Sequence, residues 1–166
     1  HTYTYTDYPN TIHRGNTVVT NGQFTLSFTV PADISYSNRN GKMSLYAYDA
    51  AQQREANGAY RRYTVGGTAT QIERDTVGPD IRLLYLNDST WSEGDKTNET
   101  PFFVAHLRDA SGINITGSSV GHDITLTIDN NPALSYNLNS YYADRTDVPG
   151  EGVVRFSIPL FSSSEM

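Results

Sequence analysis

Apolar and polar residues alternate over much of the chain, and helical spacing is almost absent. In segment 24–30, Phe, Leu and Val alternate with Thr and Ser, which is typical of a β-strand with one buried face. Asn21-Gly22 precedes it and suits a tight hairpin turn, so we expect 17–20 and 24–30 to form a hairpin. Segment 50–56 is the best helical candidate, but Asn57-Gly58 follows it, and we interpret it as a loop with at most one helical turn.

Similar runs predict further strands. Residues common in turns bound them, such as the Asp-Asn-Asn-Pro run at 129–132. The predicted strands cover residues 42–49, 59–65, 81–86, 102–107, 124–128, 134–138 and 153–158. Short strands joined by Gly, Asn, Asp and Pro turns favour sandwiches over barrels or α/β folds. The sequence therefore predicts an all-β protein.

A stretch with linker composition, Gly66-Gly67-Thr68-Ala69-Thr70, divides the chain. We expect a first β-sandwich module at 1–67, a linker at 68–79 and a second module at 80–166, both of the immunoglobulin or fibronectin III type. Such a sandwich has about seven strands, and each part predicts fewer. We therefore expect each module to be incomplete at the chain ends, or the two modules to share a sheet.

Composition removes several classes of function. The chain has no cysteine, which excludes a thiolate metal site and a cysteine nucleophile within it. Its formal net charge is −6 and its 12 Lys and Arg are scattered, which argues against nucleic-acid binding. No apolar run approaches the roughly 18–20 residues that cross a membrane. Because the chain begins with His1 and no signal peptide follows, we expect a piece of a longer protein with any targeting signal upstream.

Short motifs along nearly the whole chain carry a family resemblance. The most distinctive are Asn98-Glu99-Thr100-Pro101, Asp109-Ala110-Ser111-Gly112-Ile113-Asn114, Gly121-His122-Asp123-Ile124 and Leu138-Asn139-Ser140-Tyr141-Tyr142. Others are Tyr8-Pro9-Asn10-Thr11-Ile12, Asn21-Gly22-Gln23-Phe24, Val30-Pro31-Ala32-Asp33-Ile34-Ser35-Tyr36 and Gly78-Pro79-Asp80-Ile81-Arg82-Leu83. Together they resemble the C-terminal region of the type IX secretion system sortase, the gingipain-related cysteine peptidase family of Bacteroidetes.

The resemblance implies a non-catalytic role within a larger enzyme. It implies that these modules follow a caspase-like domain whose catalytic His and Cys lie outside this chain. It also implies that the whole protein cleaves sorting signals from secreted cargo and joins the cargo to surface lipopolysaccharide. We therefore expect a segment that scaffolds or docks the upstream peptidase domain of an exported sortase at the cell surface or outer membrane. Its expected partners are that domain and other secretion or surface-attachment components.

His122-Asp123 is the pair closest to part of a catalytic triad. Neighbours on a strand point to opposite faces, and a triad also needs a third group and an oxyanion hole. We therefore interpret both residues as hydrogen-bonding groups in a turn beside Gly121. An independent Ser/Thr hydrolase that uses His122 is the less favoured alternative.

Asp75, Asp80 and Asp109 are the best candidate ligands for a metal ion. Calcium takes roughly six to eight oxygen ligands, and carboxylates near inter-module loops can supply some of them. No EF-hand spacing is present, and Asp side chains also cap turns without a metal. We therefore expect no cofactor, and a structural calcium ion on these three residues is the alternative.

Trp91, Tyr141 and Tyr142 are candidate contacts for a glycan or a protein partner, because aromatic rings stack on sugars. Tyrosines on strands more often pack half-buried with a wet hydroxyl, so we favour packing for the tyrosines. Trp91 lies in a polar loop, where it covers the end of the module or makes an exposed contact. A glycan-binding or adhesive surface module is therefore the alternative function. Unprotected strand edges also favour an edge-strand dimer.

Overall fold

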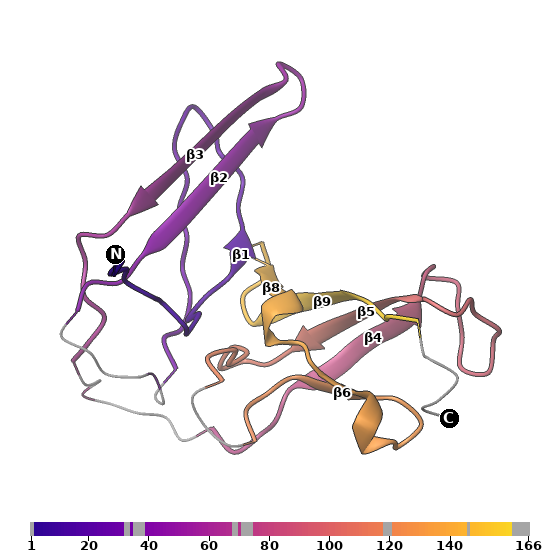
Figure 1. Cartoon of the computed structure of the whole chain (residues 1–166). Coiled ribbons are helices and arrows are strands. Elements are labelled where there is room, and N and C mark those ends of the chain that lie inside the picture. Colours follow the sequence, from indigo (N-terminus) through magenta and orange to yellow (C-terminus); the bar gives the residue numbers. More distant parts are fainter. Residues whose placement is uncertain are drawn as a thin grey trace.

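The computed structural model describes residues 2–31, 34, 39–67, 70, 75–117, 121–145 and 147–160. Within these ranges the chain is all β, with strands and two short 3₁₀ helices and no α-helix. The largest sheet has the strand order β1-β8-β9-β5-β4 (Figure 1). Its strands are β1 (Gly15–Asn16), β4 (Asp80–Leu86), β5 (Phe102–Arg108), β8 (Tyr142–Arg145) and β9 (Glu151–Ser157).

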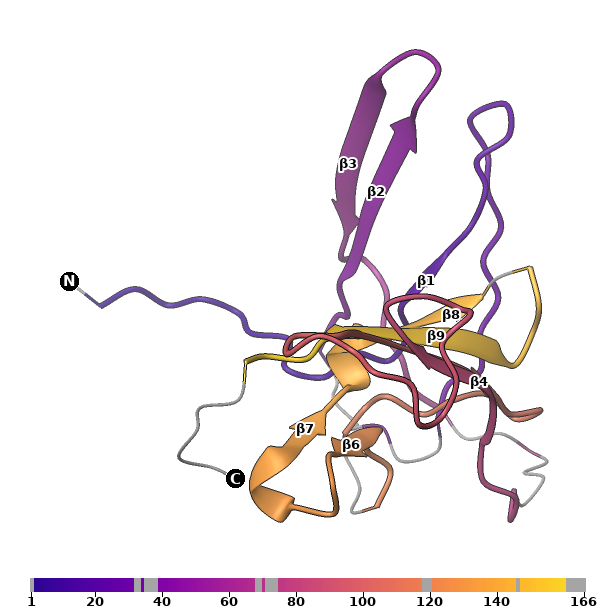
Figure 2. The ribbon, with the colours of Figure 1, turned by 90° about the vertical axis from the view of Figure 1, so that its right-hand side faces the viewer.

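Two antiparallel ribbons accompany this sheet. One consists of β2 (Met43–Asp49) and β3 (Arg54–Tyr60), and the other of β6 (Thr125–Thr127) and β7 (Ser135–Asn137). The 3₁₀ helices η1 (Pro132–Leu134) and η2 (Asn139–Tyr141) flank β7. Figures 1 and 2 show the β2–β3 ribbon rising from one side of the large sheet, with β6 and β7 on the other side.

The main core lies between the large sheet and the segments that include β6 and β7. Phe103, Ala105 and Leu107 of β5 share a face, because side chains alternate along a strand, and all three are buried. The register places Phe103 opposite Phe156 and Ala105 opposite Val154 on β9. Ile113, Ile115 and Leu138 complete the cluster, with Leu126 and Tyr136 packed against it. Burial of each large apolar side chain contributes roughly 1.5–3 kcal/mol, so this layered packing stabilises a β-sandwich.

The strongly alternating segments form strands as predicted. The predictions at 42–49, 81–86, 102–107 and 153–158 correspond to β2, β4, β5 and β9. The turn predicted at 129–132 is also present, because Asp129 and Asn130 both have positive φ, at 52° and 55°. The all-β prediction is therefore confirmed.

Other segments differ from the prediction. Strand β3 begins at Arg54 rather than at residue 59, because a short turn follows β2 and backbone pairing to β2 sets the start. In that turn, Asp49 Oδ1 accepts hydrogen bonds from the backbone N–H of Ala51 and Gln52 at 3.0 and 3.1 Å. Further upstream, the Asn21-Gly22 turn forms with φ of 52° and 77°.

The hairpin predicted around that turn has only one bridge, Thr20 to Gln23, and residues 24–30 form no strand. The exposed rings of Phe24 and Phe28 explain the difference, since alternation forms a strand only where one face is buried and a partner strand is paired.

The two predicted parts of the chain share the large sheet. β1, from the first part, pairs in parallel with β8, from the second, with Gly15 opposite Asp144 and Asn16 opposite Arg145. The backbone N–H of Asp144 also donates to Arg14 O at 2.8 Å. The boundary at 68–79 stays a prediction, and its residues 68–69 and 71–74 lie outside the described residues, as do 161–166.

Two glycines near β9 are required by close packing. Gly150 has a φ of 76°, and a Cβ there would overlap the backbone oxygen of Asp109. Gly152 lies under the ring of Tyr142, and a Cβ there would overlap its hydroxyl. These contacts allow the turn before β9 and the Tyr142 ring to lie against the backbone.

We expect Gly150→Ala to destabilise the fold. The left-handed conformation alone costs a residue with a side chain about 1–3 kcal/mol, and the overlap with Asp109 adds to this cost. Gly58→Ala is the matched control, because a Cβ at that exposed strand position meets nothing within 4 Å. Urea denaturation of both variants gives the two free energies of unfolding. Equal losses would contradict the packing assigned to Gly150.

Candidate functional site

A polar cluster lies where β1 meets β8. The hydroxyl of Tyr142 donates to Asp144 Oδ1 at 2.6 Å, and His13 Nδ1 lies 2.7 Å from Asp144 Oδ2. Tyr142 is 0% exposed, and the His13 side chain is 9% exposed. The Asp144 carboxylate therefore joins groups from both predicted parts of the chain.

Burial controls the protonation of this cluster. The pKa of Tyr142 is raised, first because burial disfavours the phenolate and then because Asp144 binds the hydroxyl and carries a negative charge. The Tyr142 hydroxyl is therefore a protonated donor at neutral pH. The His13 ring stacks on Phe28, with centroids 4.3 Å apart and planes 14° apart. These contacts fix the imidazole on two sides.

The cluster resembles an acid–base relay in its order Tyr–Asp–His. A relay of this kind activates a nucleophile through the second imidazole nitrogen. His13 Nε2 is buried and has no hydrogen-bond partner among the described residues. The arrangement therefore positions β1 and Phe28 against β8, and it presents no activated nucleophile in the part of the chain that the structure describes.

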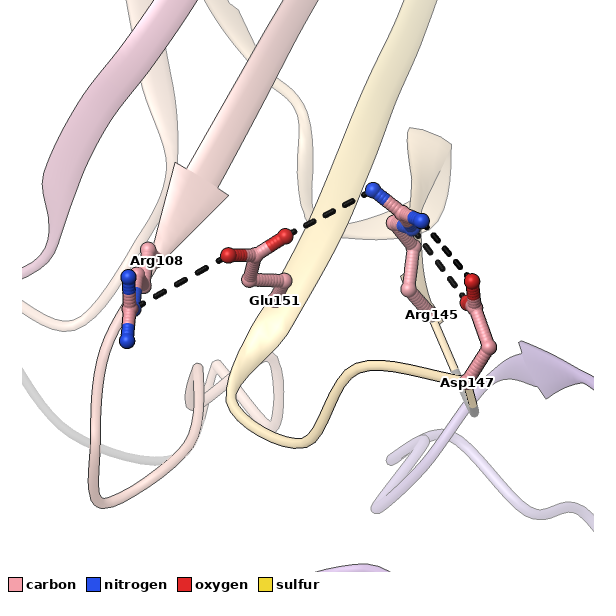
Figure 3. Close-up of polar contacts among 4 residues, drawn as sticks. All are labelled: Arg108, Arg145, Asp147 and Glu151. Atoms are coloured by element: carbon pink, nitrogen blue, oxygen red, sulfur yellow. Dashed lines mark hydrogen bonds and ion pairs between the residues drawn. The ribbon is translucent and has the colours of Figure 1, made fainter.

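A cavity of about 290 Å³ opens beside the cluster. Its polar lining residues are Asn16, His106, Asp144, Arg145, Asp147 and Arg155. Two of these lining residues, Arg145 and Asp147, belong to a chain of ion pairs that also includes Arg108 and Glu151 (Figure 3). Glu151 lies 3.8 Å from Arg108 and 3.5 Å from Arg145.

Arg145 in turn forms a two-point contact with Asp147, with Nη2 to Oδ2 at 2.8 Å and Nε to Oδ1 at 3.3 Å. The paired hydrogen bonds raise the pKa of Arg145 and lower that of Asp147. These pairs connect the ends of β5, β8 and β9, and among the lining residues Arg145 and Asp147 satisfy each other.

The structure brings together two of the three predicted calcium ligands. Ser111 Oγ donates to Asp75 and lies 2.6 Å from Asp109 Oδ1. The hydrogen bond from Ser111 and the backbone N–H of Val77 hold the pKa of Asp75 below its usual value. Asp80 instead pairs with Arg82, at 3.3 Å.

Among the described residues, no group of three or more carboxylate or imidazole side chains is arranged to hold a metal ion. Calcium at Asp75, Asp80 and Asp109 stays a prediction.

The three predicted aromatic contacts have different surroundings. Tyr142 belongs to the core and offers no exposed face. Tyr141 is exposed and packs edge-on against Phe156, with centroids 4.8 Å apart. Trp91 borders a second cavity of about 360 Å³ in the loop between β4 and β5. Its Nε1 is buried and has no hydrogen-bond partner among the described residues.

The residues around Trp91 form an ordered loop. Asn87 directly follows β4 and has a positive φ of 61°. Its side-chain Oδ1 accepts a hydrogen bond from the backbone N–H of Phe102, and its Nδ2 donates one to Thr97 Oγ1. Asp88 accepts from the backbone N–H of Thr90 at 2.8 Å, and this bond lowers the pKa of Asp88. The loop therefore holds the indole in a fixed polar setting.

His122 and Asp123 have separate partners. Nδ1 of His122 lies 3.2 Å from Asn114 Nδ2, and Asp123 Oδ1 accepts from Asn139 Nδ2 at 2.7 Å. Gly121 beside them has a φ of 85°. These contacts agree with the interpretation as hydrogen-bonding groups of a turn.

The sequence patterns did not identify His13 and Asp144. One feature of the sequence could have indicated part of the cluster. Tyr142 and Asp144 are two residues apart, and residues two apart on a strand share a face. That spacing predicts a contact between the two, but it cannot supply His13, whose place depends on the pairing of β1 with β8.

Comparison with solved structures finds a similarity that bears on the family. No family model and no curated protein matches the chain. Among solved structures, the chain is similar to PorU from Porphyromonas gingivalis, whose crystal structure is that of a dimeric, latent form. Sequence identity is 42% and the TM-score is 0.52, over 80% of this chain and 12% of PorU.

The comparison supports a relationship to PorU, the type IX secretion sortase, as the motifs indicated. The chain spans a small part of PorU, and its position in the C-terminal region stays a prediction. No helix in the described ranges is long and apolar enough to cross a membrane.

We expect the Tyr142 hydroxyl to make stability sensitive to alkaline pH. Above about pH 10, the unfolded chain releases the Tyr142 proton while the folded chain keeps it, so the free energy of unfolding falls as pH rises. Tyr142→Phe should reduce this fall and cost about 1 kcal/mol at neutral pH.

Urea midpoints between pH 8 and 11 measure the effect. Tyr48→Phe is the control, because Tyr48 is exposed on β2. An unchanged pH dependence in Tyr142→Phe would contradict the role of burial.

Proposed function

We propose that this chain is a non-catalytic β-sandwich segment of a cell-surface type IX secretion sortase. In this proposal it orients or docks a cysteine peptidase domain that lies elsewhere in the longer protein and acts on secreted cargo. The observation that carries the proposal is the 42% identity to PorU over 80% of the chain. An exported or cell-surface location follows from the same similarity.

The chemistry of the chain supports the non-catalytic part of the proposal. A cysteine peptidase needs a thiolate, and the chain contains no cysteine. The His13–Asp144–Tyr142 cluster connects structural elements, and among the described residues no nucleophile is hydrogen-bonded to His13 Nε2. The catalytic His and Cys would therefore be supplied outside this chain.

The joint between β1 and β8 supports the scaffolding part. It comprises two parallel pairs, the His13–Asp144 contact and a hydrogen bond from Arg14 Nη1 to Ser140 O. These contacts join the N-terminal part of the chain to the large sheet. A segment that orients a neighbouring domain requires such a joint.

We expect the purified chain to cleave neither fluorogenic peptides nor p-nitrophenyl esters, and His122→Ala to behave as the wild type. Active-site titration with a fluorophosphonate probe provides a second readout for an activated serine. Hydrolysis that disappears in His122→Ala would contradict the proposal and establish the Ser/Thr hydrolase.

In the longer protein, we expect Asp144→Asn to lower cleavage of cargo sorting signals while the active-site cysteine still reacts with an alkylating probe. The amide cannot replace the charge that faces His13, so the joint loosens without change to the catalytic groups. Asp129→Asn, at an exposed turn position outside both cavities, is the matched control. Wild-type cleavage by Asp144→Asn would count against a positioning role.

A glycan-binding module is the second candidate, and the Trp91 cavity favours it. The indole N–H lacks a partner among the described residues, and Asp88, Asp95, Lys96 and Thr97 also line the cavity. An aromatic ring surrounded by polar groups that donate and accept hydrogen bonds suits a sugar ring.

Trp91 is the only tryptophan, so its fluorescence reports on this cavity alone. We expect soluble surface polysaccharide to change the emission and to bind at least about tenfold more weakly, or 1.4 kcal/mol, to Trp91→Ala by calorimetry. Tyr48→Ala, which removes an exposed ring on β2, should bind normally. An unchanged affinity in Trp91→Ala would exclude the cavity as the glycan site.

A further inference from the structure

The cavity of about 290 Å³ lies over a row of residues that crosses three strands of the large sheet. His106 of β5 and Ala143 of β8 both lie directly opposite Val153 of β9. Directly opposed residues share a face, and the core residues Ala105 and Val154 lie on the other face. Val153 is buried and Ala143 is partly exposed. The cavity therefore has a small apolar floor with the His106 imidazole beside it.

Most of the charged groups that line the cavity already have partners. Asp144 accepts a hydrogen bond from the hydroxyl of Tyr142, and Arg145 forms the two-point contact with Asp147 (Figure 3). Arg155 is the exception, because its guanidinium forms no ion pair or hydrogen bond with any residue that the structure describes. The unsatisfied charge at this cavity is therefore positive.

Arg155 lies at one end of the row, away from the two carboxylates. It follows Val153 by two positions on β9, and residues two apart on a strand share a face. β8 is antiparallel to β9, so Asp144 and the following residues extend toward the opposite end. Arg155 also lies opposite the buried Val104 of β5. Its aliphatic stem can cover apolar surface there while the guanidinium stays in water.

We propose that this cavity binds a small monocarboxylate with a short apolar stem. The guanidinium of Arg155 donates two parallel hydrogen bonds to the carboxylate, and the stem lies over Val153 and Ala143. His106 supplies a further ring nitrogen at the side of the cavity. The volume is at the lower end of the roughly 300–1,000 Å³ that is usual for ligand sites, so the occupant is small.

The apolar floor and the neighbouring acids select this ligand over other anions. Inorganic phosphate also pairs with a guanidinium, but it has no apolar part to cover Val153, and its additional charge is repelled by Asp144 and Asp147. The chain carries a net charge of −6, which disfavours anions elsewhere on its surface. This inference goes beyond the proposed function and does not depend on it.

Titration of the whole chain with propionate, followed by NMR, tests the site. We expect the Nε–H signal of Arg155 and the ring signals of His106 to shift progressively, with a dissociation constant on the order of 1–10 mM. Acetate, which is one CH₂ shorter, should bind about threefold more weakly, and inorganic phosphate should also bind more weakly than propionate. Propionamide has the same stem without the charge and should cause no shift.

Substitution of Arg155 tests the charge, with the His106 signals as the readout. Arg155→Gln should bind propionate at least about tenfold more weakly, and Arg155→Lys should be intermediate, because an ammonium keeps the charge but not the paired geometry. Arg54→Gln, on the exposed strand β3, is the matched control and should bind as the wild type. Circular dichroism establishes that each variant folds. Wild-type affinity in Arg155→Gln, equal shifts with propionamide, or tighter binding of phosphate than of propionate would overturn the proposal.

A free acid and a glutamate side chain of a partner protein carry the same chemical group. N-acetylglutamate α-amide presents that group on a blocked peptide backbone. Tighter binding of this compound than of propionate would support an acidic side chain as the natural occupant, and weaker binding would support a free acid. Absence of binding by both compounds at several tens of millimolar would overturn the site itself.

Discussion

The arrangement of the chain depends on one carboxylate, that of Asp144. It lies among largely buried groups, where an ion without partners is costly, and it has two, the hydroxyl of Tyr142 and the imidazole of His13. Tyr142 belongs to the core of the large sheet, whereas His13 belongs to the N-terminal part and stacks on Phe28. Satisfying this partly buried carboxylate therefore involves both parts of the chain. The backbone pairing of β1 with β8 alone involves only two residues of each strand.

Hydrophobic alternation was sufficient to predict the strands whose one face is buried in the core. β5 and β9 are the clearest examples, because Phe103 and Leu107 of β5 and Val154 and Phe156 of β9 lie in the core as predicted strand residues. β8 was not predicted because its inward-facing positions do not form an apolar series. Asp144 lies on the same face as Tyr142, and a charged residue at that position reads as solvent-facing in a search for alternating apolar residues. The segment 24–30 was assigned to a strand because alternation records the spacing of apolar residues but not the presence of a pairing partner. Pairing is a long-range property that local sequence does not contain.

The candidate site residues were also predicted only in part, because their contacts depend on segments that are distant in the sequence. Composition correctly indicated a chain without a thiol, and the turn interpretation of His122 agrees with its contact to Asn114. The pattern could not distinguish Tyr141 from Tyr142, although one is exposed and the other is buried. Adjacent side chains point in different directions, so the orientation of the backbone decides which ring enters the core. His13 was missed because its partner lies more than 100 residues away in the sequence.

Gly152 has a consequence for how this sequence can vary. The Tyr142 ring occupies the volume that a side chain at 152 would need, so the two positions form one unit across β8 and β9. Exchange of Gly152 for any larger residue requires a smaller residue at 142, and that exchange removes the hydroxyl that binds Asp144. A compensating change at 144 or 13 would then be needed. Four positions, distributed over the two ends of the chain, are therefore expected to change together among relatives, or not at all.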